Sequence, residues 1–317
     1  MDSNLNMNNI PEKDLTRISG NFFRAMTGGN YHSEDVATIF KFAEYLKDEK
    51  NTDLKKYKVA IVCVCLNEHY WQFLKNMVDG AKKFFLPGHD VDVLCWSDMP
   101  ESSNYGATVF ETEPVEWPLP TLMRYHLFLQ QEEKLKEYDY IFYCDADMLF
   151  VNYVGDEILG NGLTAAQHPG YAVRKEYWPP YEPNEKSASY IKRPGRVIND
   201  GGKPRFMPLY FAGGFFGGRT KEFLDACRGI RDLVDKDFAM DYIPIWNDES
   251  ALNKYLESHP PDVVLTPSYV YPDSLIKEYY LPLWGCDYPP KIITLTKSFS
   301  LSKEGGEFVK KILDEQK

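Results

Sequence analysis

Continuous apolar runs and amphipathic stretches alternate through the middle of the chain. The first run, KVAIVCVC at residues 58–65, is rich in β-branched side chains, which is typical of a strand buried on both faces of a sheet. From Tyr70 to Phe85, apolar side chains recur every three or four positions, and Pro87-Gly88 follows. This spacing predicts a helix that packs one face against the strand and ends before the Pro-Gly pair.

The same alternation continues to residue 144. Short apolar runs at 91–96 and 107–111 indicate two strands, residues 120–137 a helix, and YDYIFYC at 138–144 a third clear strand. This order is typical of an α/β fold with a Rossmann-like, mostly parallel central sheet and flanking helices. Because ligands of such sheets bind beyond the carboxyl ends of the strands, the residues after position 144 are the first candidates for a site.

The second half of the chain has a mixed pattern of shorter elements. We expect strands at 163–167, 208–213 and 263–267, and helices at 220–234 and 249–258. The stretch from Trp178 to Pro208 is polar and proline-rich, with little periodicity. A stretch of about 30 such residues inside a compact domain predicts a functional loop or lid.

The two ends of the chain differ from this middle part. Residues 1–56 are mostly polar, and one amphipathic pattern at 33–49 indicates a single helix. We expect them to form an N-terminal extension ahead of one domain at residues 57–300, with a C-terminal tail at 301–317.

Composition and charge narrow the classes of partner. With 317 residues, of which 44% are hydrophobic, the chain can bury a large core. Its net charge of −11 would repel a nucleic-acid backbone or an anionic membrane surface, so we expect no nucleic-acid partner. A phosphate ligand would need a local basic or backbone-amide site, or a bridging divalent cation.

Cysteine usage and the N-terminus predict the compartment. Six cysteines are too few for a disulfide framework in a chain of this length, and several lie in apolar runs. The sequence has no run of about 18 apolar residues and no basic and apolar leader at its start. We therefore expect a cytoplasmic protein without a membrane anchor.

Asp145-Ala146-Asp147 is the strongest candidate site, because it directly follows the strand at 138–144. Two carboxylates one residue apart on a tight turn suit Mn²⁺ or Mg²⁺, which keeps its other positions for water and substrate phosphates. Loop solvation and helix capping are the alternatives without a ligand. The competing enzyme class, phosphatases with an aspartyl nucleophile, needs a small hydroxylated or β-branched residue where this chain has Leu149.

The run FAGGFFGG at 211–218 places four glycines within six positions. We predict it at the end of a strand and before a helix, where glycines permit close approach of the backbone to a ligand. A glycine-rich turn required by packing is the alternative. Since no Gly-Lys-Ser/Thr follows, the run is not a phosphate-binding P-loop.

Two smaller motifs complete the candidates. IWNDESALNKYL at 245–256 places Asp248 at the N-cap of a predicted helix and Glu249 in its first turn, so capping explains both acids. Trp246 beside them favours a sugar subsite instead, because aromatic faces stack on sugar rings and acids bind hydroxyls. His168 stands alone before a Pro-Gly turn, a position that is more often structural than catalytic.

Together, YCDADMLF, TAAQHPGYA, YFAGGFFGG and WNDESALNKYL resemble the family 6 glycosyltransferases, the group of the histo-blood-group A and B transferases and the α-1,3-galactosyltransferases. The resemblance extends from about Lys58 to Lys297. It implies a GT-A fold with a mixed acceptor-binding half. It also implies transfer, with retention, of N-acetylgalactosamine or galactose from UDP-GalNAc or UDP-Gal to a galactoside or fucosylgalactoside in α-1,3 linkage.

For the metal and the diphosphate, the resemblance implies that Asp145, Ala146 and Asp147 hold Mn²⁺, or alternatively Mg²⁺, together with the UDP-sugar. Arg124 matches an arginine near the donor sugar. Lys297 matches a C-terminal lysine that closes on the diphosphate.

For the rest of the donor, Tyr70 matches a tyrosine that stacks near uracil, and Cys65 and Asn67 match positions in the base pocket, although their identities differ. Ala212-Gly213-Gly214 matches the triplet around the C2 substituent of the donor sugar. Because Gly214 has no side chain, we expect N-acetylgalactosamine to be preferred.

For the acceptor, His168, Trp246 and Glu249 match family residues, with Glu249 at the position proposed as the nucleophile. Asn247 departs from the family pattern, which has a histidine there, and residues 271–273 align ambiguously. We expect no anchor or stem like that of the animal enzymes, as in the microbial and viral members. A sugar- or UDP-binding module without activity is the alternative, and the retained acids argue against it.

Overall fold

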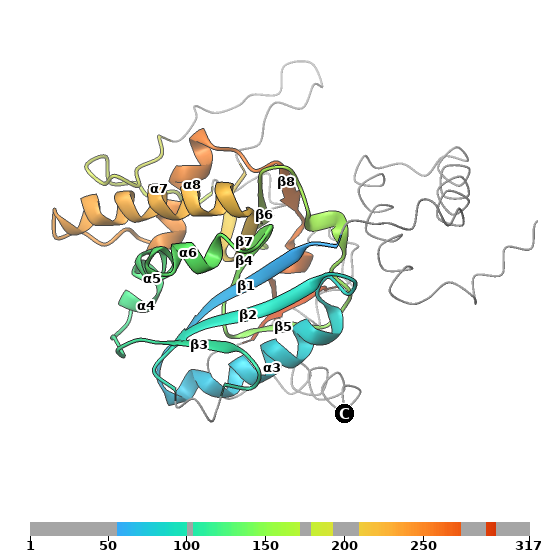
Figure 1. Ribbon diagram of the computed structural model, residues 1–317. Coiled ribbons are helices and arrows are strands. Elements are labelled where there is room, and N and C mark those ends of the chain that lie inside the picture. Colours follow the sequence, from blue (N-terminus) through green and yellow to red (C-terminus); the bar gives the residue numbers. More distant parts are fainter. Residues whose placement is uncertain (1–55, 100–103, 172–178, 193–208, 274–289, 296–317) are drawn as a thin grey trace, which may run out of the picture.

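The computed structural model describes residues 56–99, 104–171, 179–192, 209–273 and 290–295. Within this part, a seven-stranded sheet forms the centre of the molecule (Figure 1). Across the sheet, the strands follow the order β3 (Thr108–Glu111), β2 (Asp90–Ser97), β1 (Lys58–Cys65), β4 (Tyr140–Cys144), β7 (Phe211–Arg219), β6 (Leu163–Gln167) and β8 (Val263–Leu265).

The sheet is mostly parallel, as the alternation of strands and helices predicts. β1 pairs in parallel with β2 and β4, and β2 pairs in parallel with β3. In the described sheet, only β7 runs antiparallel to its neighbours, β4 and β6, while β6 and β8 are parallel to each other. The carboxyl ends of β1 and β4 therefore open at the same edge, where a ligand of such a fold is expected.

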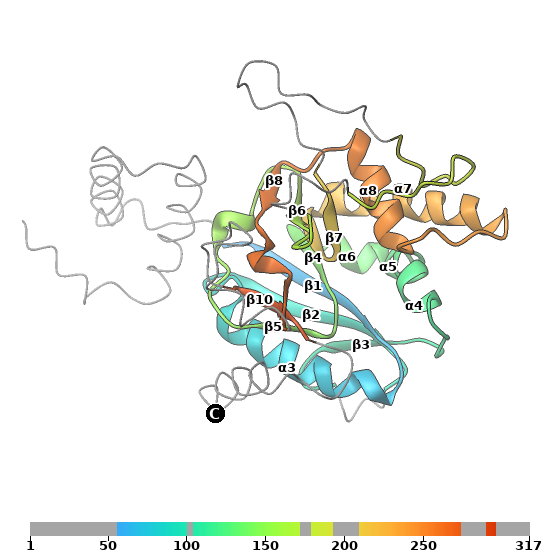
Figure 2. The same ribbon diagram turned by 180° about the vertical axis from the view of Figure 1, so that it is seen from behind.

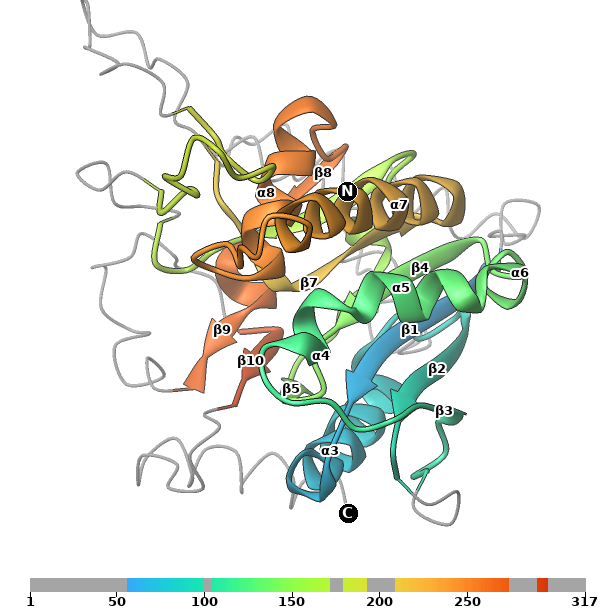
Figure 3. The same ribbon diagram turned by 90° about the vertical axis from the view of Figure 1, so that its left-hand side faces the viewer.

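Helices cover both faces of the sheet. α3 (Glu68–Phe84) lies on one face, as the view from behind shows (Figure 2). Figure 3 shows α5 (Arg124–Gln130), α7 (Thr220–Phe238) and α8 (Asp248–Ser258) on the other face. The shorter helices are α4 (Leu119–Leu122), α6 (Glu132–Leu135), η4 (Asp156–Ile158) and η5 (Pro267–Tyr269). None of the helices in the described residues is long and apolar enough to cross a membrane.

β1 shows why its sequence is apolar throughout. Val59, Ile61 and Cys63 belong to the buried cluster beneath α3, whereas Ala60 and Val62 belong to the cluster beneath α5 and α7. Successive side chains of a strand point to opposite faces, so a strand covered by helices on both sides is apolar at each position. The prediction of a doubly buried strand is confirmed.

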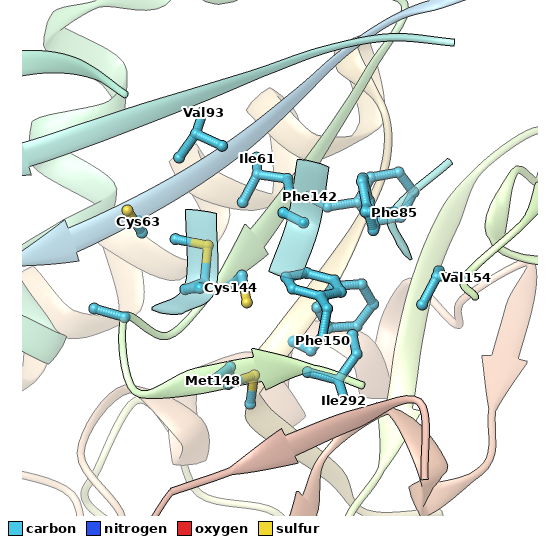
Figure 4. Packing of buried hydrophobic residues seen from close by; sticks show 14 of the residues in the cluster. Ile61, Cys63, Phe85, Val93, Phe142, Cys144, Met148, Phe150, Val154 and Ile292 are labelled. Carbon is cyan, nitrogen blue, oxygen red and sulfur yellow. The ribbon is translucent and has the colours of Figure 1, made fainter. Parts of the chain in front are cut away.

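A second, three-stranded sheet packs against the buried cluster beneath α3. Its strands are β5 (Met148–Phe150), β10 (Ile292–Thr294) and β9 (Tyr271–Pro272), and β10 is antiparallel to β5 and parallel to β9. Figure 4 shows Phe150 and Ile292 of this sheet close to Phe142 of β4 in one buried cluster. Because β5 begins directly after Asp147, the small sheet anchors the turn that carries the two aspartates.

The single helix predicted at 120–137 is wrong, since the structure has α4, α5 and α6 there. The first break falls at Met123. The Nε of Arg124 donates to the carbonyl of Thr121 at 3.0 Å, an acceptor that a continuous helix would offer to the amide of Tyr125. The side chain of Arg124 thus occupies a carbonyl that a continuous helix would use for its own hydrogen bonds.

The glycine run lies inside β7, so the prediction that it ends a strand is also wrong. A Cβ on Gly217 would lie 2.3 Å from the carbonyl oxygen of Ile141, and one on Gly218 would lie 2.2 Å from that of Gly162. Packing between β4 and β6 therefore explains these two glycines. Glycine in a strand interior resembles a turn signal in sequence, although it can mark close backbone approach instead.

The remaining predicted elements occur within a few residues of their expected places. Residues 1–55 with the expected helix, the tail at 301–317 and residues 193–208 of the proline-rich stretch lie outside the described residues. The five described cysteines are buried and unbridged.

Candidate active site

The turn Asp145-Ala146-Asp147 begins where β4 ends, at the carboxyl edge of the sheet. The amide of Asp145 donates to the carbonyl of Gly214 in β7 at 3.0 Å. The amide of Leu295, directly after β10, donates to the carbonyl of Asp147 at 2.9 Å. Main-chain hydrogen bonds from two distant segments thus hold the turn and keep its carboxylates in place.

A cavity of about 500 Å³ opens beside this turn. Small-molecule sites typically occupy about 300–1,000 Å³ and combine apolar walls with a few polar groups. The residues that line it are Val64, Leu66, Asn67, Tyr70, Pro114, Val115, Glu116, Trp117, Pro120, Thr121, Tyr143, Asp145, Ala146 and Asp147. Its size falls in the range of small-molecule sites, and two carboxylates stand at one of its walls.

Asn67 and Tyr70, two of the three residues expected at a base pocket, line this cavity at the start of α3. Asp98 accepts a hydrogen bond from the amide of Asn67 at 2.9 Å and so fixes this end of the helix. Cys65 is not part of the lining. Its side chain lies in the core beneath α3, and the residues on either side of it line the cavity instead.

Arg124 lies next to the aspartate turn and is almost completely buried. Its Nη1 is 3.3 Å from Oδ1 of Asp145, and its Nη2 is 2.5 Å from Oδ2 of Asp248. The guanidinium also lies over the ring of Tyr143, 4.2 Å from its centroid. Burial disfavours the charged form, yet the charge of Asp248 prevails and raises the pKa of Arg124 well above its usual value. The site therefore contains a permanent cation.

The two carboxylate oxygens of Asp145 have different surroundings. Oδ1 accepts hydrogen bonds from the hydroxyl of Tyr143 and from Arg124. None of the described residues donates a hydrogen bond to Oδ2. Oδ2 is the oxygen that would approach a Cβ on Gly214, at 3.0 Å.

These residues fit a divalent cation. Carboxylate oxygens are the ligands that Mn²⁺ and Mg²⁺ prefer, and Asp145 and Asp147 both border the cavity. The described residues contain no group of three or more histidine, cysteine, aspartate or glutamate side chains arranged to hold a metal ion. A cation here would therefore take few protein ligands and complete its shell with water and with phosphates bound in the cavity.

Glu249 faces the glycines of β7 from the first turn of α8. Its Oε2 accepts a hydrogen bond from the amide of Gly213 at 2.7 Å. Burial raises the pKa of Glu249 to about 7, although the Gly213 amide and the nearby hydroxyl of Tyr210 favour the charged form. The carboxyl group is thus balanced between its two protonation states near neutral pH, as is common for reacting groups.

The glycines of β7 allow this strand to pack closely against Asp145 and Glu249. A Cβ on Gly214 would lie 2.5 Å from Cε of Met148 in addition to its contact with Asp145. Ala212 is small and buried, and Ala146 lines the cavity. The structure therefore brings the glycine pair of β7 into contact with both acidic groups.

His168 and Trp246 each connect to the surroundings of Glu249. The amide of His168 donates to the carbonyl of Tyr210 at 2.9 Å, and burial lowers the pKa of His168 to about 4, which leaves the ring neutral. The carbonyl of Trp246 accepts from the amide of Glu249 at 3.0 Å, and the residue is 46% exposed. Lys297 lies outside the described residues.

Asp248 is not the helix cap that the sequence predicts. Asn247, with a φ of 51°, precedes α8, while the buried carboxylate of Asp248 binds Arg124 and accepts from the hydroxyl of Tyr125 at 3.0 Å. An acid at the start of a helix has the same sequence pattern whether it turns to the helix amides or into the core. Only the position of Arg124 distinguishes the two.

Three residues that contact the site or its surroundings are not among those predicted from the sequence, namely Tyr143, Tyr210 and Glu182. Tyr143 stands two residues before Asp145, so the alternation of β4 could have placed both on one face. Tyr210 directly precedes the glycine run. Glu182 is buried in the proline-rich stretch, and no sequence pattern distinguishes it from the exposed acids there.

Residues 42–281 match the model of glycosyltransferase family 6. The histo-blood group ABO system transferase 1 of Rattus norvegicus is 32% identical over 218 residues, 65% of this chain and 59% of the relative. The globoside alpha-1,3-N-acetylgalactosaminyltransferase 1 of Homo sapiens is 29% identical over 216 residues, 64% of this chain and 58% of the relative.

A bacterial protein is similar over more of its own length. The O-antigen biosynthesis glycosyltransferase WbnI of Escherichia coli is 26% identical over 219 residues, 68% of this chain and 88% of that protein. The match to each of the two mammalian relatives covers less than two thirds of that relative's length.

Proposed function

The chain belongs to glycosyltransferase family 6, and we propose that it transfers N-acetylgalactosamine, or galactose, from a UDP-sugar to a terminal galactoside in α-1,3 linkage with retention. The mostly parallel sheet with helices on both faces supports a GT-A fold. The human relative, an alpha-1,3-N-acetylgalactosaminyltransferase by name, supports the choice of sugar and linkage. The observation that carries the proposal is the position of Asp145 and Asp147 in the wall of a nucleotide-sized cavity.

The cavity is the proposed site of the uridine and the diphosphate. Tyr70 supplies an aromatic face for the base, and Asn67 supplies amide groups that can hydrogen-bond to its polar edge. The aspartate turn lies at the same cavity, so the diphosphate would extend from the base toward Asp145 and Asp147. An acidic chain needs such a local arrangement to bind an anion.

Asp145 and Asp147 would hold Mn²⁺ or Mg²⁺ beside the diphosphate. When bound, the ion offsets negative charge on the departing UDP. Tyr143 and Arg124 engage Oδ1 of Asp145, which orients Oδ2 for the ion. Lys297 is the further cation that we expect to close on the diphosphate.

Two groups of the chain act on the charges that develop during transfer. Arg124 adds permanent positive potential beside Asp145, close to the leaving group. Glu249, held by the amide of Gly213, stabilises or captures the positive charge at the anomeric carbon. As in retaining glycosidases, its carboxylate would act on the sugar face opposite the leaving group.

The acceptor hydroxyl would approach the anomeric carbon from the face that UDP leaves, with Glu249 on the opposite face, as retention requires. Trp246 offers a partly exposed aromatic face for a sugar ring, and the neutral ring of His168 can donate or accept a hydrogen bond. The carbonyl of Trp246 accepts from the amide of Glu249, and His168 packs against Tyr210, whose hydroxyl lies near Glu249. This arrangement would place the acceptor hydroxyl near the anomeric carbon.

The absence of a side chain at Gly214 supports N-acetylgalactosamine as the preferred sugar. Gly214 packs closely beside Asp145, since a Cβ there would already lie 3.0 Å from Oδ2, and Ala212 is also small. A site without bulky side chains at these positions would be better able to admit the acetamido group at C2 of the donor.

A panel assay tests the proposal. The protein is incubated with Mn²⁺, with UDP-N-acetylgalactosamine, UDP-galactose or UDP-glucose, and with plain or fucosylated galactosides. We expect an α-1,3-linked product with the first donor and less with the second. UDP binding by calorimetry without transfer from any donor would instead favour an inactive sugar-nucleotide-binding module, and phosphate release without an acceptor would favour a phosphatase.

A further inference from the structure

Glu182 is a buried acid outside the catalytic cluster. Its side chain belongs to the segment 179–192, which lies beside α8 in Figures 2 and 3, and the residue is 1% exposed. Its Oε2 accepts from the amide of Ile245 at 2.7 Å, and its Oε1 accepts from the hydroxyl of Tyr242 at 2.8 Å and the amide of Asn184 at 2.8 Å. Three donors thus compensate for the burial of one carboxylate.

The hydrogen bond to Ile245 reaches the main chain one residue before Trp246. Ile245 and Trp246 belong to a turn at residues 244–249 that leads into α8. In it, the amide of Asn247 donates to the carbonyl of Pro244 at 2.9 Å, and the amide of Glu249 donates to the carbonyl of Trp246 at 3.0 Å. The carboxylate of Glu182 is therefore connected to the main chain of Glu249 through Ile245 and Trp246. Glu182 thus holds the start of this turn from a different segment of the chain.

Apolar packing and polar contacts both hold the turn at residues 244–249. Pro244 is buried, whereas the nearby apolar residues Met240, Ile243, Ile245 and Trp246 are 49%, 45%, 54% and 46% exposed. At Trp246 itself, the amide donates to Oγ of Ser250 at 3.2 Å. Because the exposed apolar residues contribute little burial, the bond from Ile245 to Glu182 adds to what holds the main chain next to Trp246.

The segment that carries Glu182 is itself anchored independently. Asp237, fully buried at the end of α7, accepts from the hydroxyls of Ser187 and Ser189 at 3.0 and 2.9 Å and from the amide of Ala188 at 2.7 Å. Glu182 consequently acts from a fixed support and not from a loose loop.

We propose that Glu182 is a positioning residue of the acceptor site, which holds the main chain of Ile245 and thereby sets the orientation of Trp246. It touches neither substrate, and the donor cavity lies outside its contacts. The inference rests on the proposed function, because it takes Trp246 as the acceptor platform. It adds a role for the proline-rich segment, which would act as a brace of the acceptor site.

The test compares Glu182→Gln with Glu185→Gln in the full chain. Glu185 is an exposed acid in the same segment, so this control makes the same chemical change without the buried hydrogen bonds. In Glu182→Gln, an NH₂ group replaces one of two carboxylate oxygens that both accept hydrogen bonds, and an NH₂ group cannot accept one. We expect its KM for the galactoside to rise about tenfold or more, the scale of losing a hydrogen bond to a charged group. Its KM for the UDP-sugar and its Kd for UDP should stay at the wild-type values.

Two further variants separate positioning from general loosening. Asp237→Asn weakens the support of the segment without removing the bond to Ile245, so it should lower Tm with a smaller change in acceptor KM. Glu182→Asp keeps the charge and decides the matter if the glutamine variant does not fold. It should show the same split between acceptor and donor.

The outcomes distinguish this inference from the proposed function. If the wild type transfers sugar and both Glu182 variants keep the wild-type acceptor KM, the positioning role is wrong. The same holds if donor and acceptor KM rise together, or if Asp237→Asn matches Glu182→Gln in acceptor KM. If the wild type transfers from no donor, the proposed function fails instead. In that case, quenching of tryptophan fluorescence measures the Kd for a galactoside. A higher Kd in Glu182→Gln than in wild type would support the positioning role, and equal values would contradict it.

Discussion

Arg124 and Asp248 form an ion pair in the interior, with Nη2 of the arginine 2.5 Å from Oδ2 of the aspartate and both side chains only 4% exposed. The pair joins α5 to the first turn of α8, and Arg124 also contacts Asp145. A single guanidinium therefore links the aspartate turn of the proposed donor site to the helix that carries Glu249. Changes at either partner should affect both stability and catalysis.

The substitution Asp248→Asn should destabilise the fold strongly. It leaves the guanidinium of Arg124 buried with only part of its compensating charge, at a cost of about 3–5 kcal/mol. Chemical denaturation measures this loss. As a control, Asp225→Asn removes exposed pairs with Lys221 and Arg228 and should cost at most about 1 kcal/mol. Equal losses in the two variants would contradict the role given to the buried pair.

Asp147→Asn should abolish most metal-dependent transfer. The change removes one of two proposed anionic ligands of the ion that offsets charge on UDP, so activity should fall at least about a hundredfold. Initial rates with Mn²⁺, with Mg²⁺ and with chelator measure the effect, and calorimetry measures Mn²⁺-dependent UDP binding. Asp232→Asn, an exposed acid of α7, is the control. Full wild-type activity in excess chelator would refute the metal requirement.

Glu249→Gln should remove transfer and leave UDP binding nearly intact. The carboxylate acts at the sugar, whereas Asp145 and Asp147 act at the phosphates, so the two functions separate. Rates of transfer and calorimetry with UDP measure them on the same preparation. A folded variant with lost UDP affinity would show that Glu249 serves the diphosphate and not the sugar.

The pH dependence of transfer should follow the ionisation of Glu249. Because burial raises its pKa to about 7, kcat/KM should increase with pH up to about 7, as the carboxylate that stabilises the anomeric cation forms. A profile of kcat/KM between pH 5 and pH 9, at saturating metal, tests this. An acidic limb with its midpoint near the ordinary glutamate value would contradict the raised pKa.

The same pKa has a consequence for stability, with a definite sign. The folded protein binds this proton more tightly than the unfolded chain, so the stabilisation is complete below the ordinary value of 4.5 and is lost as pH rises to about 7. Glu249→Gln lacks this dependence. The unfolding free energy of the wild type, relative to the variant, should therefore decrease across this window in metal-free buffer.

Gly214→Ala should shift the donor preference toward UDP-galactose. A Cβ there would approach Oδ2 of Asp145 and Cε of Met148, and overpacking of about 1–3 kcal/mol corresponds to roughly tenfold or more in relative rate. The ratio of kcat/KM for the two UDP-sugars measures the shift. Gly213→Ala, whose Cβ would meet Glu249 instead, should lower the rate with a smaller change in this ratio. An unchanged ratio in Gly214→Ala would mean that this position does not distinguish the sugars.

Much of the fold follows from local patterns. The run at 58–65 must be buried on both faces because each of its residues is apolar, and the structure places α3 on one side and α5 and α7 on the other. The aspartate turn falls after β4 as expected, since the end of an apolar run marks the end of a buried strand. The glycine run has an ambiguous pattern, because glycine occurs both in turns and where strands pack closely.

The sequence by itself determined the type of fold, the place of Asp145 and Asp147 at the edge of the sheet, and the resemblance of its motifs to one family. Only the tertiary structure decided what Asp248 and Glu182 bind, and that the side chain of Cys65 points into the core. Hydrophobic periodicity depends on neighbours within one element, so it can be read along the chain. The partner of a buried charge comes from a distant element, such as Arg124 for Asp248, and is chosen by packing alone.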